Sequence, residues 1–341
     1  MKKAFAAVLM VAVMIVATGG FSSSYGADPA AVTLKYSTFA NPGLKSYGKM
    51  EQYCKEIEKR TGGRVKLQLY PGSTLAPAKF TYNAVLDGVA DVGHLVFSYS
   101  RGSFPLIEIL DLPLGSKAGS LSTHLMNAWY KKFQPKELKE LKILFITGKG
   151  PNIIHTKRPV NKLADLKGMK IRTTGLGEKI VSGLGAVPVG MAMPETYDAI
   201  QKGVAEGVLA PEEALLNWRF AEVVKYTTPL YGANSSACIA HVMSKKKWDS
   251  LPEDVRKIWD KFNEEWIDVV AKMYDEEDIE GEAFAKKKGV KMLALSKEDQ
   301  AKCAAAAQPI LQDYIKRMKA KGLPGEESVK FCLDYIKARQ K

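Results

Sequence analysis

A strand–helix–strand pattern over residues 32–69 constrains the fold more than any other feature of this 341-residue sequence. Apolar and polar residues alternate over 32–36 and again over 65–69, as they do along half-buried strands. Between these runs, apolar residues over 50–57 recur at helical spacing, and Gly62 follows where that helix should end. Two strands joined through a helix at this spacing pair in parallel. The sequence therefore predicts an α/β protein.

The alternation of strands and helices continues along the chain in two α/β units. An apolar strand over 143–146 leaves the first unit, the second unit begins near Pro151, and an apolar strand over 238–243 returns. A helix that begins at 251–254 and continues towards Phe284 is long for a globular protein. Further helices are predicted over 78–86, 121–133, 178–184, 194–200, 218–224, 310–318 and 329–336, and further strands over 87–93, 169–173, 187–189, 203–208 and 292–295.

The first 27 residues have the features of a secretory leader. Lys2 and Lys3 precede an apolar run from Ala4 to Thr18, which is shorter than the roughly 20 residues that span a bilayer. Small residues offer a cleavage site after Gly26 or Ala27, and no cysteine lies nearby to carry a lipid anchor. We therefore expect residues 1–27 to be removed and the mature chain to be periplasmic.

The charge of the chain is basic, with a formal value of +13. Such a balance suits nucleic acids, acidic membrane surfaces or small anions. The lysines are spread along the chain beside acidic residues, and the longest basic run is only Lys245-Lys246-Lys247. Together with the predicted export, this pattern indicates a solvated surface and no nucleic-acid partner.

The cysteines leave two readings open for an exported chain. There are four, Cys54, Cys238, Cys303 and Cys332, with long spacings and no CxxC pair. We expect all four to be free and buried, because Cys54 falls on the apolar stripe of a helix. One disulfide of undetermined pairing is the alternative.

Patterns for catalysis and cofactors are weak. Gly175-Leu176-Gly177 resembles the start of a dinucleotide fingerprint, but Ile180 stands where the third glycine belongs. The four histidines have no zinc-binding spacing, and no GxSxG motif occurs. The sequence predicts no cofactor, no metal and no enzyme activity.

Arg172 is the strongest candidate for a ligand-binding residue. The strand over 169–173 places it near a carboxyl end, just before a turn with Gly175 and Gly177. Ligands of open α/β sheets bind at such strand ends. A guanidinium can grip a carboxylate there through two parallel hydrogen bonds. The alternative is an arginine on a solvated edge strand.

Two motifs resemble those of the substrate-binding proteins of tripartite ATP-independent periplasmic (TRAP) transporters. They are Gly168-Met169-Lys170-Ile171-Arg172 and the run from Pro194 to Gly207, within a resemblance that covers residues 32–266. The resemblance implies a periplasmic binding protein-like fold, with two α/β lobes around a ligand cleft that are joined by crossover strands and a long helix. The expected ranges are 28–150 plus 236–277 for lobe I, 151–235 plus 278–320 for lobe II, and 321–341 for a C-terminal helix that packs on the lobes.

The resemblance also implies that Arg172 binds a substrate carboxylate. The chain departs from the family pattern at two positions, Asn152 where many members have arginine and Ala210 where many have asparagine. Each change removes a strong hydrogen-bond donor, so we expect a ligand with fewer polar groups than those of members that keep these donors. Met193 matches a wall position of the family. Aromatic surface is expected from Phe39, Phe80 and Trp218.

The expected function is that of a periplasmic receptor for an organic acid. It would deliver the acid to the small and large membrane subunits of a TRAP permease, as a monomer that closes by a hinge near Gly150 and Asn234. A monocarboxylate with an apolar or aromatic body is the expected ligand, and a small hydroxy- or keto-acid is the competing one. A ligand sensor without a transport role is the alternative function, and an exported enzyme on this scaffold a weaker one.

Overall fold

A five-stranded sheet contains the predicted βαβ unit. The computed structural model describes residues 31–100 and 102–340, so the predicted leader lies outside the described residues. Strand β1 pairs in parallel with β2 and β3, which confirms the predicted pairing, whereas β10 runs antiparallel to β3 and β4. In spatial order the strands are β2 (Val65–Tyr70), β1 (Val32–Ser37), β3 (Val92–Val96), β10 (Ser236–Ser244) and β4 (Leu141–Pro151). We call this the first sheet.

The second sheet has six strands and carries Arg172 on β6, one strand in from its edge. Strand β6 pairs in parallel with β7 and β8, and β5 runs antiparallel to β8 and β9. In spatial order the strands are β11 (Lys291–Met292), β9 (Tyr226–Thr228), β5 (Ile153–Thr156), β8 (Gly207–Ala210), β6 (Lys170–Thr173) and β7 (Val187–Gly190). The neighbours of β6 on both sides exclude the alternative that Arg172 lies on an edge strand.

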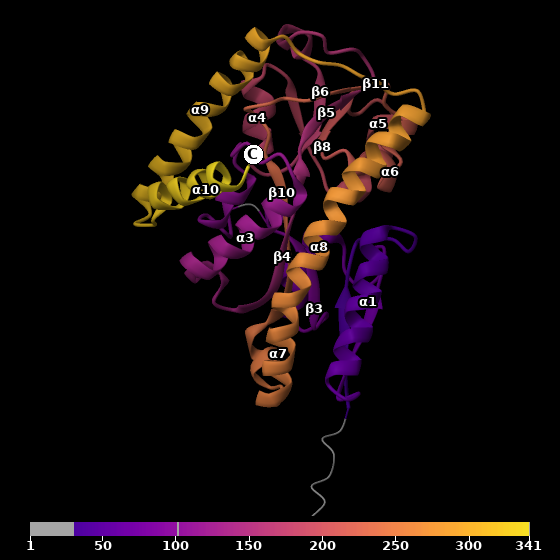
Figure 1. Cartoon of the computed structure of the whole chain (residues 1–341), viewed down its shortest axis with the longest axis vertical. Coiled ribbons are helices and arrows are strands. Elements are labelled where there is room, and N and C mark those ends of the chain that lie inside the picture. Colours follow the sequence, from indigo (N-terminus) through magenta and orange to yellow (C-terminus); the bar gives the residue numbers. More distant parts are fainter. Residues whose placement is uncertain (1–30, 101, 341) are drawn as a thin grey trace, which may run out of the picture. The chain divides into compact units, whose positions relative to one another are not determined.

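Two crossover strands and one long helix connect the sheets. β4 ends the first sheet at Pro151 and β5 begins the second at Ile153, while β10 brings the chain back. Helix α8 (Glu253–Lys287) has 35 residues and packs on β4, α1 and α3 as well as on α6 and β11, as Figure 1 shows in orange. The predicted long helix and crossovers are confirmed. The predicted lobe ranges stay predictions.

The other helices cover the two sheets. They are α1 (Lys45–Arg60), α2 (Thr81–Leu86), α3 (Gly119–Phe133), α4 (Gly177–Gly183), α5 (Thr196–Gln201), α6 (Glu213–Asn217), α7 (Lys245–Asp249), α9 (Lys297–Ala320) and α10 (Gly325–Arg339). Short 3₁₀ turns include η1 (Ala78–Phe80), η2 (Phe97–Tyr99), η3 (Ile107–Asp111), η6 (Met193–Glu195) and η7 (Phe220–Glu222). None of the described helices is long and apolar enough to span a bilayer.

Several predicted boundaries are wrong, because single residues with positive φ interrupt the chain. The strand expected from residue 87 begins at Val92, and the strand expected from residue 203 begins at Gly207, since Gly88 (φ 74°) and Gly203 (φ 78°) form turns. The helix expected over 218–224 does not form. Arg219 has a φ of 57° and separates α6 from η7.

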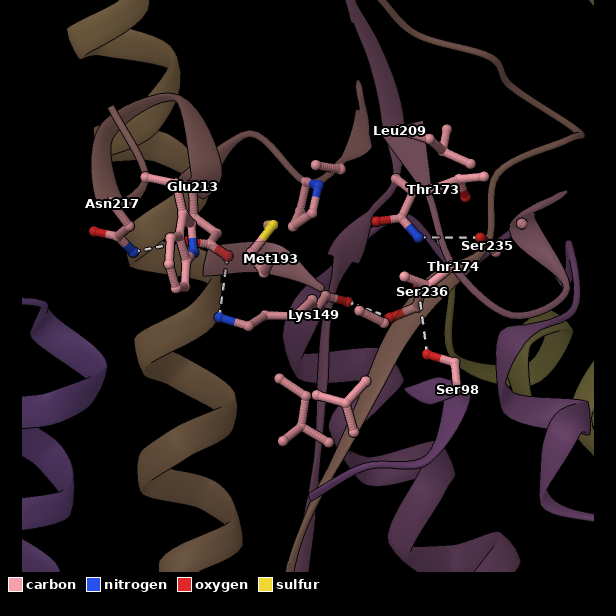
Figure 2. A pocket seen from close by; sticks show the side chains of 18 of the residues that line it. Ser98, Lys149, Thr173, Thr174, Met193, Leu209, Glu213, Asn217, Ser235 and Ser236 are labelled. Carbon is pink, nitrogen blue, oxygen red and sulfur yellow. Dashed lines mark hydrogen bonds and ion pairs between the residues drawn. The ribbon is translucent and has the colours of Figure 1, made fainter. Parts of the chain in front are cut away.

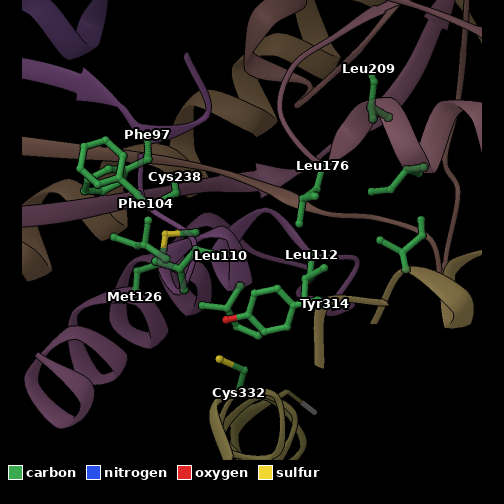
Figure 3. Close-up of a cluster of buried hydrophobic side chains, with 14 of the residues drawn as sticks. Phe97, Phe104, Leu110, Leu112, Met126, Leu176, Leu209, Cys238, Tyr314 and Cys332 are labelled. Carbon is green, nitrogen blue, oxygen red and sulfur yellow. The ribbon is translucent and has the colours of Figure 1, made fainter. Parts of the chain in front are cut away.

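A large hydrophobic cluster joins α3, η3, α9 and α10 (Figure 3). Buried polar groups within it are paired: Trp129 Nε1 donates to Ser328 Oγ at 2.6 Å, and Tyr314 Oη donates to the Leu106 carbonyl at 2.7 Å. All four cysteines are free and buried, so the disulfide alternative does not apply. These contacts fix α10 against α3 and α9.

Candidate functional site

A cavity lined by residues of both sheets contains most of the predicted site residues. The space between atoms in this cavity is about 900 Å³, counting its open mouth. Six of the seven predicted residues line it: Phe39, Asn152, Arg172, Met193, Ala210 and Trp218. Phe80 is not among the lining residues. It ends η1 with 59% of its surface exposed, while Ala78 of the same turn is buried.

Arg172 is buried in the cavity wall and has neutral partners. Its Nε and Nη2 donate to the Met191 carbonyl at 3.0 and 2.8 Å, and Nη1 lies 3.5 Å from the sulfur of Met193. Burial lowers the pKa of Arg172, and the hydroxyl of Tyr99 and the charge of Glu195 oppose that shift. Arginine nevertheless stays charged. The structure thus holds a desolvated cation that forms no ion pair with a carboxylate in the described part of the chain.

Tyr99 links this arginine to the other side of the cavity. It belongs to η2, which follows strand β3 of the first sheet, whereas Met193 follows β7 of the second. Tyr99 Oη accepts a hydrogen bond from the Met193 backbone N–H at 2.9 Å. Tyr99 was not found from the sequence, because no pattern connects residues 94 positions apart.

An aromatic wall faces the polar groups. Phe39 lies 6.3 Å from Trp218 between ring centroids, with 28° between the planes, and 4.4 Å from the ring of His94 in a parallel stack. Phe39 belongs to a buried cluster with Val96, Ala192 and Ile239, against which Tyr99 and Trp218 pack. This wall suits a flat apolar body.

Hydroxyl and amide groups form another part of the wall. Asn152 Nδ2 donates to Ser235 Oγ at 3.0 Å, so its Oδ1 keeps free acceptor capacity. Ser98 Oγ and Thr174 Oγ1 lie 3.4 Å apart, on η2 and on the turn after β6. Ala210 ends β8, and its carbonyl is already bonded to His155 Nε2 at 3.1 Å. The side chain of Ala210 is only a methyl group, so neither its side chain nor its carbonyl offers a ligand a strong hydrogen-bond donor.

A charged cluster in the cavity was missed from the sequence. Lys149 of β4 lies 3.1 Å from Glu213 Oε1 of α6, and Asn217 Nδ2 donates to Glu213 Oε2 at 2.7 Å. Lys149 Nζ also lies 4.0 Å from the ring centre of Tyr274 and 3.9 Å from Glu277 Oε2, both on α8. We call Lys149, Glu213 and Asn217 the charged cluster. Its one sequence signal is a lysine between two glycines in an apolar strand.

The electrostatics of these groups follow from burial. Burial acts to lower the pKa of Lys149, but Glu213, Tyr274 and Glu277 more than compensate, and the pKa is raised. Burial raises the pKa of Glu277 to about 7, with Lys149 opposing and Glu213 adding to the shift. No group of three or more His, Cys, Asp and Glu side chains that could hold a metal ion occurs in the described residues.

The arrangement defines a class of protein. Two sheets joined by crossover strands, with a desolvated cation in the cavity that both of them line, are the features of solute-binding proteins that enclose an anionic ligand between two lobes.

Comparison with protein families gives the particular family. Residues 36–317 match the model of the bacterial extracellular solute-binding proteins, family 7. The chain belongs to this family and is a TRAP solute-binding protein. The resemblance noted from Arg172 and the run 194–207 is thereby confirmed, and so is the predicted fold class.

Solved structures of similar proteins agree in fold. A TRAP periplasmic solute-binding protein from Desulfovibrio salexigens is 35% identical, with a TM-score of 0.80 over 92% of this chain and 98% of that one. A marine metagenome TRAP protein specific for aromatic acids, solved with 3-hydroxybenzoate, is 28% identical with a TM-score of 0.86 over 92% and 100%. A Rhodoferax ferrireducens TRAP protein, solved with benzoate, is 26% identical with a TM-score of 0.84 over 90% and 98%.

Proposed function

We propose that this protein is a periplasmic receptor that binds an aromatic monocarboxylate and delivers it to the small and large membrane subunits of a TRAP permease. The observation that carries this proposal is Arg172, a buried cation with neutral partners in a cavity walled by Phe39 and Trp218. A ligand carboxylate would supply the missing negative charge, and the rings would cover its body.

The composition of the cavity supports one carboxylate rather than several. The other lining cation, Lys149, is already paired with Glu213, and Asn152 and Ala210 carry no charge. A second ligand carboxylate would lose its hydration without gaining a cationic partner. The benzoate and 3-hydroxybenzoate of the two similar proteins fit this expectation.

The remaining expectations are part of the same proposal. The family consists of solute-binding transport proteins, and the chain's role as a binder without turnover follows that pattern. We propose that residues 1–27 are cleaved on export, that the mature protein is a monomer, and that it closes by a hinge at the crossovers near Gly150 and Asn234.

The test is a titration of the mature protein with benzoate, 3-hydroxybenzoate, lactate, pyruvate and succinate by calorimetry, together with the R172A variant. We expect an aromatic monocarboxylate to bind most tightly. R172A should weaken binding by a factor of roughly 30 to several thousand, because truncating one partner of a buried charge pair costs about 2–5 kcal/mol.

R219A is the matched control. Arg219 is exposed, pairs with Glu222 and does not line the cavity, so its loss should leave affinity unchanged. If no carboxylic acid binds, or if R172A binds like the parent protein, the proposal is wrong. Tighter binding of lactate or pyruvate would instead favour a small hydroxy- or keto-acid as ligand.

A further inference from the structure

The charged cluster has no task in the binding of a carboxylate by Arg172. Lys149, Glu213 and Asn217 come from β4 and α6, whereas Arg172 is on β6. All three line the same cavity. Figure 2 shows them joined by dashed lines, with Glu213 and Asn217 on one side of Met193 and Ser235, Thr174 and Ser98 on the other. The cavity thus has a polar corner of its own, formed by Lys149, Glu213 and Asn217.

Glu213 is the acceptor in this corner. Its side chain is 2% exposed, and each of its oxygens has one partner: Oε1 lies 3.1 Å from Lys149 Nζ, and Oε2 accepts from Asn217 at 2.7 Å. A carboxylate can accept about four hydrogen bonds, so roughly half of that capacity is unused. Lys149 and Asn217 hold the carboxylate in place, which makes it a preorganised acceptor.

The charges in this corner determine which ligand groups can bind there. Lys149 and Glu213 neutralise each other, and Glu277, which lies 3.9 Å from Lys149, has a pKa raised to about 7 by burial. A ligand carboxylate would meet Glu213 as a like charge, and a ligand ammonium would compete with Lys149. A neutral donor such as a hydroxyl group adds a hydrogen bond without adding a charge.

We propose that Glu213 accepts a hydrogen bond from a hydroxyl group on the ligand, and that the ligand is therefore a hydroxy-substituted aromatic monocarboxylate. This inference rests on the proposed function and specifies its substrate class. Lys149 and Asn217 act as positioning residues, because they orient the carboxylate of Glu213. The aromatic wall and Arg172 bind the parts of the ligand that all aromatic acids share.

The first test uses the wild-type protein. Dissociation constants are measured by calorimetry for benzoate and phenylacetate and for their 2-, 3- and 4-hydroxy and methoxy derivatives. At least one hydroxy isomer should bind about 10- to 100-fold more tightly than the unsubstituted acid, as expected of a hydrogen bond to a charged acceptor. Its methoxy counterpart, which cannot donate, should lose that gain.

The second test assigns the preference to Glu213. E213Q removes the charge of the acceptor and should reduce the hydroxy-to-unsubstituted affinity ratio about fivefold or more, while affinity for the unsubstituted acid changes less. E212Q is the matched control, since Glu212 is the preceding residue and does not line the cavity. The hydroxy-to-unsubstituted affinity ratio of E212Q should equal that of the wild type.

The outcomes separate this inference from the proposed function. If aromatic acids bind through Arg172 but no hydroxy isomer gains affinity, or if E213Q keeps the wild-type ratio, the inference is wrong and the proposed function stands. If no acid binds to the wild type, both are wrong. Should E213Q fail to fold, N217A tests the same assignment, because it removes the donor that holds Glu213 Oε2 and should also lower the hydroxy-to-unsubstituted affinity ratio.

Discussion

Arg172, Tyr99 and Met193 form a small unit in the cavity wall. The Met191 carbonyl fixes the direction of the guanidinium, and Tyr99 holds the Met193 backbone N–H from the other side of the cavity. Because Tyr99 and Met193 follow strands of different sheets, their hydrogen bond exists only when the two sides of the cavity are close together. Ligand affinity should therefore depend on a residue that need not touch the carboxylate.

The Y99F variant tests this dependence. It removes the hydroxyl that serves Met193 and Arg172, and a hydrogen bond of this kind contributes about 0.5–1.5 kcal/mol. We expect Y99F to weaken binding of the best aromatic acid roughly 3- to 10-fold, measured by calorimetry. Y231F is the control, because Tyr231 is exposed and does not line the cavity. Equal affinities of Y99F and Y231F would contradict the prediction.

The packing of α8 against α6 depends on a single glycine. At Gly281, an added Cβ would lie 2.3 Å from the carbonyl oxygen and 2.7 Å from the carbonyl carbon of Glu212. These are backbone atoms just before α6, so no side chain can rotate away to make room. The close approach positions the helix that carries Glu213 and Asn217.

G281A and G48A should have opposite effects on stability. G281A forces α8 and α6 apart, and overpacking of this kind costs about 1–3 kcal/mol or more. Gly48 is an exposed residue inside α1 with open space at its Cβ position, so G48A should stabilise the protein by about 0.5–1 kcal/mol. Urea denaturation measures both. A G281A variant as stable as wild type would show that the helices can separate at no cost.

Buried histidines connect the stability of the whole molecule to pH. Burial lowers the pKa of His155 to about 4, although hydrogen bonds from its ring to the backbone of Ala210 and Pro211 oppose the shift, and burial lowers the pKa of His241 to about 3. At pH values between its folded pKa and 6.5, such a histidine is neutral in the folded protein and protonated in the unfolded chain. Its contribution to stability is full above pH 6.5 and is lost as pH falls towards 4. Glu277 and Asp278, whose pKa values burial raises to about 7, have the opposite effect on stability. Their contribution is full at low pH and is lost as pH rises towards 7.

A comparison of variants at two pH values isolates the histidine contribution. H155Q removes the hydrogen bonds of His155 to Thr227 and Ala210 at every pH, so it should be destabilising at pH 7.5. At pH 5, wild type has itself lost about 2 kcal/mol through this histidine. The destabilisation by H155Q, measured by urea denaturation, should therefore be smaller at pH 5 by about that amount. The same destabilisation at both pH values would contradict the assigned shift.

The sequence was sufficient for those features that depend on neighbouring residues. Alternation over residues 32–36 and 65–69 predicted parallel strands, the apolar spacing after residue 251 predicted the long helix, and the strand around Arg172 predicted its place at the edge of a cavity. Strand boundaries near Gly88 and Gly203 were missed, because a turn with positive φ depends on how the chain packs after it.

The same distinction holds for the site. The place of Arg172 in the cavity wall was predictable from the sequence, because its position before a glycine turn is local and the motif around it resembles those of TRAP binding proteins. The pair of Lys149 with Glu213, the hydrogen bond of Tyr99 to Met193 and the exposure of Phe80 were not, because each is set by segments far apart in the chain. Local periodicity determines which strands and helices form. Which side chains meet in the cavity is determined by the way β4, β10 and α8 join the two sheets, and no short stretch of sequence contains that information.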